Sequence, residues 1–253
     1  MLSELRVVPI NQVFLHEEYE VERLKKLCSR IKNEQKVKNP PIALQLEHDK
    51  YLILDGAHRT LSLQRLNCKR IVIQVVDLEF LSIDAWAHHL VDAENLIEEL
   101  LQNPDLLWRK EKYAVEPIAT LFVRNEKHYV YTPADFYMDV KKRITIWKEI
   151  VNSYSSKYNF DRITAEQLPV DRGIVFQYPA FHIDQIKKIV DEGLLLPAGV
   201  TKFTLTCGRI LNLNIPLSFL IREDYVEEDW LELLALWRAS IRLYTDPVFL
   251  CEI

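Results

Sequence analysis

Hydrophobic and polar positions in the first third of the chain follow an order that predicts an α/β unit. Apolar residues at helical spacing, with charges on the opposite face, predict a helix over residues 21–35. A second helix is predicted over 57–66, with Asn67 suited to close it. Short apolar runs, one of them rich in β-branched residues, predict strands at 5–9, 42–46, 51–54 and 70–76. The charged "EHDK" between the second and third of these strands suits a hairpin.

The remaining sequence predicts a mixed α/β region. Helices are expected over 83–103, 133–154 (with Pro133 at its start), 182–193 and 226–244. Strands are expected at 128–131 and 173–177, with two more on either side of a Cys207-Gly208 turn. No Gly/Ser-rich linker interrupts the chain, so this region should pack directly on the first. We therefore divide the chain into 1–80 and 81–253, both within one α/β (α+β) fold class.

Composition narrows the classes of function. The 253 residues are 49% hydrophobic and carry a formal net charge of −5, which offers no general basic footprint for nucleic acid. The four cysteines form no CxxC pair, which argues against a zinc site or a redox dithiol. The N-terminal residues lack the pattern of a signal peptide, and no apolar run is long enough to span a bilayer. We expect a cytoplasmic protein without a membrane partner.

The turn "DGAHRT", residues 55–60, is the first candidate site. A helix N-terminus presents unpaired N–H groups and a partial positive charge, and a preceding Gly56 lets a ligand approach the backbone. Arg59 adds a planar donor fork suited to phosphate, and Asp55 would orient a metal or a substrate hydroxyl. The residues alone favour a simple capped turn over a phosphate site. Neither GxxxxGK[ST] nor GxGxxG is present.

The second candidate lies in "FLHEEYEVERL", where His16, Glu17 and Glu18 lead into the first predicted helix. Carboxylates at a helix start interact favourably with the helix dipole, which is a structural role. One of them could instead act as a general base on a hydroxyl. The spacing leaves both interpretations open.

The segments "PPIAL", "YLILDGAHRTLSLQRLN" and "RIVIQVV" together resemble the ParB/sulfiredoxin fold. In that fold the G-x-H-R turn binds nucleotide phosphates. Ala57 stands where sulfiredoxins carry their nucleophilic cysteine, and the partition motif and helix-turn-helix of ParB proteins are missing. "LHEEYEVERL", "DGAHR" and the region around Trp86 instead resemble the free L-serine kinases. "YVYTPADF", "WKEIVNSYS" and "LPAGVTKFTLTCGRILNLNIPLSFL" extend that resemblance, within a branch tied to siderophore clusters, over nearly the whole chain.

This resemblance implies phosphoryl transfer from ATP, or from ADP, to L-serine with Mg²⁺ as cofactor. The product, O-phospho-L-serine, would feed siderophore (L-2,3-diaminopropionate) biosynthesis. Carried over by position, Glu17 would be the catalytic base, and Asp55 would help to orient the hydroxyl or the metal. The resemblance places phosphate binding at Gly56, Ala57, His58, Arg59 and Thr60, and amino-acid binding at Trp86 and Thr201. It identifies no direct metal ligands.

A rival function is a ParB-like DNA-binding transcriptional regulator that responds to heme. Histidine and cysteine side chains that could ligate heme iron are Cys28, Cys207, His88, His89 and His182. A free cysteine or a lone histidine is more typical of packing, so we assign no heme ligand. The last predicted helix, which contains Leu231 and Trp237, would either pack on the body or form the seam of a homodimer.

Overall fold

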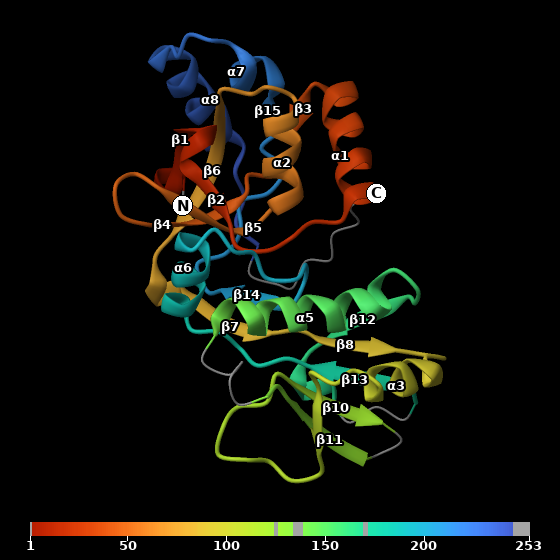
Figure 1. Cartoon of the computed structure of the whole chain (residues 1–253). Coiled ribbons are helices and arrows are strands. Elements are labelled where there is room, and N and C mark those ends of the chain that lie inside the picture. The colour runs from red at the N-terminus through yellow and green to blue at the C-terminus, as the bar shows by residue number, and fades with distance from the viewer. Residues whose placement is uncertain (1, 124–125, 134–138, 169–171, 245–253) are drawn as a thin grey trace.

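The computed structural model describes residues 2–123, 126–133, 139–168 and 172–244, which form two stacked lobes (Figure 1). The first lobe is built on a five-stranded sheet from the N-terminal part of the chain, and the second on a six-stranded sheet from its middle. This arrangement confirms the predicted α/β fold class.

The first sheet is mixed and has the order β1-β6-β4-β5-β2. Strand β6 runs parallel to β4 and β2 runs parallel to β5, while the β1–β6 and β4–β5 pairs are antiparallel. All but one of the residues of β6 are buried, as expected of a run rich in Val and Ile at the centre of a sheet. The strands are β1 (Leu5–Pro9), β2 (Val13–Leu15), β4 (Ile42–Gln45), β5 (Tyr51–Asp55) and β6 (Arg70–Val76).

Two helices pack against each other beside this sheet. Helix α1 (Val21–Glu34) buries Leu24 and Ile31 and leaves its charged positions outside. Helix α2 (Ala57–Arg65) begins directly after β5, and Asn67, at φ 57°, follows its C-cap as predicted. The predicted strands, helices and hairpin of this segment are confirmed.

The C-terminal segment returns to the first lobe. Strand β15 (Ile215–Pro216) pairs with β3 (Lys36–Val37), and helices α7 (Leu217–Ile221) and α8 (Glu227–Ser240) follow. Trp230 and Trp237 of α8 are buried in the same apolar cluster as the residues of β1 and β6. In Figure 1 the blue C-terminal helices accordingly lie beside the red and orange N-terminal elements.

The second lobe is an antiparallel sheet with the order β12-β8-β13-β10-β11-β9. Helices α3 (Glu94–Leu101) and α5 (Val140–Ser155) contribute to its core, and α6 (Ile183–Asp191) lies near the first lobe (Figure 1). Its core is rich in aromatic rings, among them Trp147, Tyr154 and Phe176. The strands are β8 (Ala87–Leu90), β9 (Leu107–Arg109), β10 (Ala119–Val123), β11 (Glu126–Tyr131), β12 (Phe160–Ile163) and β13 (Ile174–Gln177).

Two predictions for this part of the chain are wrong. The helix predicted over 83–103 consists of β7 (Leu81–Ala85), β8 and the shorter helix α3. Of the two strands predicted on either side of Cys207-Gly208, the first is confirmed as β14 (Thr201–Leu205), which pairs with β7, but residues 209–214 form no strand and β15 is only Ile215–Pro216, paired with β3. In the first case strand partners far away in sequence override the local pattern, because helical propensity is too weak to resist such pairing.

A third difference concerns the start of the long helix. Residues 134–138 of the predicted helix lie outside the described residues. Helix α5 begins at Val140, with the Asp139 side chain accepting a hydrogen bond from the Lys142 N–H. Trp108 lies on β9.

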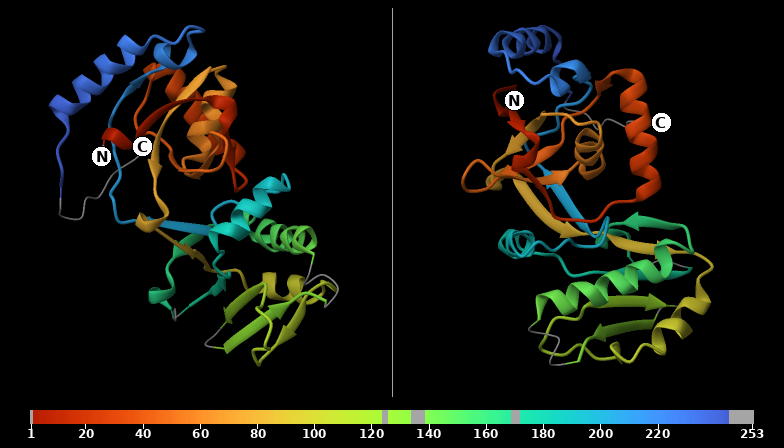
Figure 2. Two further views of the ribbon diagram at one scale, coloured as in Figure 1. Left: turned by 90° about the vertical axis from the view of Figure 1, so that its left-hand side faces the viewer. Right: turned by 45° about the horizontal axis from the view of Figure 1, so that its top comes forward.

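The β7–β14 ribbon and α6 join the lobes (Figure 2). Ile186 of α6 is fully buried among Ile42, Leu52 and Leu54 of the first sheet, and Ile83 and Phe203 of the ribbon pack on the same cluster. The two lobes therefore share an apolar contact that fixes their relative position. None of the helices in the described part of the chain is both long and apolar enough to cross a membrane.

Candidate functional site

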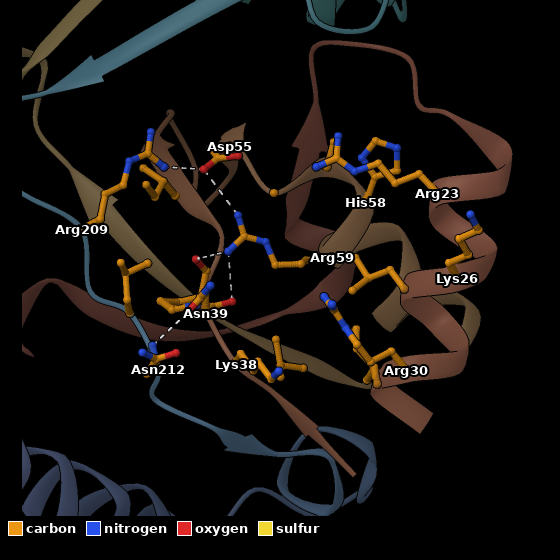
Figure 3. A pocket seen from close by; sticks show the side chains of 18 of the residues that line it. Arg23, Lys26, Arg30, Lys38, Asn39, Asp55, His58, Arg59, Arg209 and Asn212 are labelled. Atoms are coloured by element: carbon orange, nitrogen blue, oxygen red, sulfur yellow. Dashed lines mark hydrogen bonds and ion pairs between the residues drawn. The ribbon is translucent and has the colours of Figure 1, made fainter. Parts of the chain in front are cut away.

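A cavity of about 750 Å³ opens between α1, the start of α2 and the segments 36–42, 198–199 and 209–214 (Figure 3). Four carboxylates line it, but twice as many of its lining residues are basic, in a chain whose net charge is negative. These lining cations are Arg23, Lys26, Arg30, Lys36, Lys38, Arg59, Arg162 and Arg209. This local concentration of positive charge favours an anionic ligand.

The predicted turn opens α2 at the wall of this cavity. Gly56 is the N-cap at φ +101°, a conformation that L side chains rarely adopt. A Cβ at this position would lie 3.0 Å from both Arg59 Nε and Pro41 Cβ, so the backbone conformation favours glycine and the space for a side chain is tight. The first N–H groups of α2 have no partners within the helix, which makes this end of the helix a ready anion site.

Asp55 lies between two guanidinium groups, as Figure 3 shows. Arg59 Nη2 is 3.4 Å from Asp55 Oδ2, and Arg209 Nη1 donates a short hydrogen bond to the same oxygen. Partial burial raises the pKa of Asp55, but Arg59 and Arg209 outweigh it, so the pKa lies below its ordinary value. The carboxylate is therefore charged at neutral pH and holds both arginines in place.

Arg59 also connects the turn to the neighbouring segment 39–40. Its Nη1 donates to the backbone carbonyls of Asn39 and Pro40, at 3.2 and 3.1 Å. The guanidinium thus ties the 39–40 segment to α2 and keeps its positive charge beside the helix N-terminus.

The other residues of the turn differ in exposure. Ala57 is buried, and the fully buried Thr60 donates its hydroxyl hydrogen to the Gly56 carbonyl at 3.1 Å. Any contribution of Thr60 to phosphate binding therefore acts through the shape of the turn. His58 lines the cavity and accepts from the Glu20 N–H at 3.0 Å through Nε2. Burial, with Arg23 nearby, lowers the pKa of His58, which keeps the ring neutral.

Glu17 enters the cavity from the loop before α1. Its Oε2 accepts a hydrogen bond from the Gly199 N–H at 3.0 Å. The main chain on either side pairs with Leu196 of the second lobe, since Glu18 donates to the Leu196 carbonyl and Leu196 donates to the His16 carbonyl. The predicted general base therefore stands where the two lobes meet.

His16 and Thr201 support Glu17 from behind. The buried His16 ring donates from Nδ1 to the Ile53 carbonyl at 2.8 Å, so Nε2 accepts from the Thr201 hydroxyl, also at 2.8 Å. Burial lowers the pKa of His16, consistent with this neutral tautomer. Thr201 Oγ1 lies 3.5 Å from Glu17 Oε2. The structure therefore brings together two predicted site residues that are 184 positions apart in the sequence.

A buried hydrogen-bond chain holds Gly199 from the second lobe. The Gly199 carbonyl accepts from His88 Nε2 at 3.0 Å, and His88 Nδ1 accepts from the Tyr154 hydroxyl at 2.6 Å. Tyr154 Oη in turn accepts from Tyr178 at 2.7 Å. Burial lowers the pKa of His88 to about 4, so it stays neutral and both ring nitrogens bond to protein groups. The same glycine whose N–H contacts Glu17 is thus fixed through its carbonyl.

Trp86 lies outside the residues that line the cavity. It sits between β7 and β8. Its backbone N–H donates to the Val200 carbonyl at 3.0 Å, and Lys202 Nζ is 5.3 Å from the centroid of its ring. Among the described residues, no group of three or more His, Cys, Asp or Glu gathers to hold a metal ion. A divalent ion at this site would depend on one or two carboxylates together with phosphate oxygens, as Mg²⁺ commonly does.

Sequence reasoning missed most of the cavity wall. Arg23, Lys26 and Arg30 recur at helical spacing, which could have indicated one basic face of α1. Arg162 and Arg209 reach the cavity from β12 and from the segment after β14, and no local pattern marks them.

The whole chain is similar to known proteins in sequence and in fold. The chain is 32% identical over 255 residues to the ATP-dependent L-serine kinase SbnI of Staphylococcus aureus, covering 99% of this chain and 98% of the relative. The structure of SbnI with a C-terminal truncation superposes with a TM-score of 0.82 at 30% identity, covering 92% of this chain and 96% of the other. A free serine kinase in complex with AMP shares the fold, with a TM-score of 0.70 at 18% identity over 86% and 93% of the two chains. No family model matches the chain.

Proposed function

Because this chain belongs to the ATP-dependent L-serine kinases, we propose that it transfers the γ-phosphoryl group of ATP to the hydroxyl of free L-serine. The products are O-phospho-L-serine and ADP, and the hydroxyl proton leaves to a base. One observation carries the proposal: the carboxylate of Glu17 faces a cavity with an excess of basic side chains, beside a glycine-opened helix N-terminus. This arrangement pairs a base with an anion site, and phosphoryl transfer to an alcohol requires both.

Glu17 is the base in this proposal. A general base must reach the hydroxyl directly or through one water. The Gly199 N–H, the Leu196 main chain and the His16–Thr201 pair restrict where the carboxylate can point. The base is therefore preorganised before the substrate binds, which lowers the cost of reaching the reactive geometry.

The turn at Gly56 holds the phosphates. The N–H groups at the start of α2 and the positive end of its dipole contribute fixed partial charges. Arg59 and Arg209, both held by Asp55, add full charges beside the turn. Arg23 lies beside His58 of the turn, and Arg30 and Lys38 continue the basic wall away from it (Figure 3). Charge stabilisation of this kind contributes most of the catalysis in phosphoryl transfer.

The cavity offers a carboxylate that would bind Mg²⁺ together with the phosphates of the nucleotide. Asp55 is a carboxylate at the cavity wall beside the phosphate turn, and Mg²⁺ usually binds one or two carboxylates together with substrate phosphates, so Asp55 would hold the ion while Glu17 acts as the base. When bound, the ion would neutralise charge on the phosphate oxygens. Asp55 already compensates two arginines, so its contribution to the ion would be shared with them.

A direct assay tests the proposal. The full chain is incubated with L-serine, ATP and Mg²⁺, and phosphoserine and ADP are quantified together. We expect the two products in equal amounts, because one phosphoryl group moves for each ATP consumed. ADP release that is independent of serine, or no phosphoserine at all, would overturn the proposal. A parallel reaction with ADP as donor determines which nucleotide is used, with AMP as the coproduct in that case.

A further inference from the structure

Arg162 of β12 is the second-lobe cation at the cavity wall, and it lies across the backbone of Gly199. Gly199 has a φ of +73°, and a Cβ there would come within 2.1 Å of Arg162 Nη2 and 2.4 Å of Cζ. Glycine is therefore needed for the guanidinium to lie where it does. The N–H of the same glycine donates to Glu17 Oε2 at 3.0 Å. Arg162 and Glu17 therefore both contact Gly199.

The charge of Arg162 is only partly compensated. Its Nη2 is 3.5 Å from Glu20 Oε1, longer than the 2.7–2.9 Å of a well-formed charge-assisted hydrogen bond. The side chain is 33% exposed, and both partners line the cavity. A guanidinium has five N–H donors in a planar fork that matches a carboxylate. An arginine that is only loosely paired and lies against the backbone of Gly199 is suited to bind an anionic group of a ligand.

We propose that Arg162 binds the α-carboxylate of the amino acid whose hydroxyl faces Glu17. This inference rests on the proposed function for the identity of the substrate. In serine only three bonds separate the hydroxyl oxygen from the carboxyl carbon, so a serine bound beside Gly199 would place these two groups near the two side chains that contact this glycine, Glu17 and Arg162. The consequence is selection for a free amino acid, since a serine within a peptide has no α-carboxylate.

The main alternative ligand is a nucleotide phosphate. His58 of the phosphate turn accepts from the Glu20 N–H, and the Glu20 side chain reaches Arg162, so the turn and Arg162 are linked through one residue. We favour the carboxylate because Arg162 belongs to the second lobe and shares Gly199 with Glu17, whereas the cations beside the turn belong to the first lobe. The two ligands predict different responses when Arg162 is replaced.

The test compares L-serine with L-serinamide, which retains the hydroxyl and the amine but has a neutral carboxamide. Calorimetric Kd values, measured without nucleotide, and steady-state KM values are determined for wild type, Arg162→Gln and Arg162→Lys. We expect wild type to bind L-serine at least about tenfold more tightly than L-serinamide, since the carboxylate makes a charge-assisted pair. Arg162→Gln should raise the Kd for L-serine by a similar factor and leave the Kd for L-serinamide nearly unchanged. Arg162→Lys should restore part of the preference.

A matched control is Lys157→Gln, which removes another second-lobe cation, one that pairs with Glu99 and does not line the cavity. It should change neither Kd. If Arg162→Gln binds L-serine as tightly as wild type does, or binds both compounds more weakly by the same factor, the inference is overturned. If instead it raises the KM for ATP and leaves the L-serine preference intact, Arg162 binds phosphate. A wild-type protein that binds L-serine through Arg162 without phosphorylating it would refute the proposed function and keep this inference.

Discussion

The two lobes bury different kinds of side chain in their cores. The first lobe joins apolar residues of its sheet, helices and returning C-terminal segment in one cluster, with Trp230 and Trp237 at its edge. The second lobe buries a hydrogen-bonded chain of His88, Tyr154 and Tyr178 among its aromatic rings. The first lobe supplies the proposed base, Glu17, and the proposed phosphate turn, while the second holds Gly199, whose N–H donates to the Glu17 carboxylate. Chemistry and positioning are thus divided between the lobes.

The largest effect should come from the chemical side of this division. We expect Glu17→Gln to lower kcat for phosphoserine formation by about 10²–10⁴-fold, the typical contribution of a general base. Nucleotide binding should persist, because the α2 turn is unchanged. The measurement is single-turnover phosphoserine production alongside ADP titration.

Glu18→Gln is the matched control for that variant. It removes the adjacent carboxylate and its 2.6 Å ion pair with Lys148, which is partly exposed and contributes about 0–1 kcal/mol. Most of the activity should remain. Full activity in Glu17→Gln would remove this residue from its assigned role.

The buried histidine of the second lobe should make stability dependent on pH. Burial lowers the pKa of His88 to about 4, whereas an unfolded histidine titrates near 6.5. Between these values the unfolded chain binds a proton that the folded chain does not, so stability falls as the pH drops from about 6.5 to about 4. The loss amounts to about 1.4 kcal/mol per pH unit, or about 3 kcal/mol in total.

Urea midpoints across this pH range measure the effect. His88→Gln should give a flatter pH profile than wild type, and His89→Gln, which alters the adjacent, less buried ring, should retain the slope. Identical slopes in wild type and His88→Gln would show that His88 does not carry the dependence.

Tyr154→Phe sharpens the contrast between the lobes. The variant leaves His88 Nδ1 and the Tyr178 hydroxyl without their buried partner, which should destabilise the fold by about 1–3 kcal/mol. It should also lower kcat/KM, because the free Nδ1 no longer fixes the His88 tautomer that donates to Gly199. The ¹⁵N shifts of the His88 ring report that tautomer directly.

Tyr129→Phe on β11, outside this network, is the control and should change neither quantity. If Tyr154→Phe loses stability but keeps both the His88 tautomer and full activity, the chain only supports the core and does not position the base.

The smallest expected effect concerns the phosphate turn. Arg59→Ala should raise the Kd for ADP by about tenfold, equivalent to about 1.4 kcal/mol. Arg59→Lys should recover part of this, since it keeps the charge but loses the fork that holds the Asn39 and Pro40 carbonyls. Arg65→Ala, in the last turn of α2, should bind ADP normally. Unchanged affinity in Arg59→Ala would refute the phosphate-turn assignment.

Local sequence pattern was sufficient for the core of the first lobe. Strand β6 and helix α1 carry the periodicity of their structures within themselves, and the glycine before α2 marks the start of that helix. The Asp55–Thr60 turn could therefore be placed from its residues. Its phosphate-binding role came from family resemblance, because the residues alone also fit a capped turn.

Other features depend on contacts between distant residues. Residues 83–90 have a helical pattern, but they form strands because β12, β13 and β14 offer partners that no local window contains. Arg162 and Arg209 reach the cavity from positions far from the turn, and Glu17 meets Gly199 across 182 residues. Short-range periodicity encodes helices and central strands, whereas charge placement around a site is a property of the folded chain alone. Glu17 was proposed as the base from family resemblance, since its spacing alone left a structural role open, whereas the contacts that hold its carboxylate depend on the way the two lobes pack together.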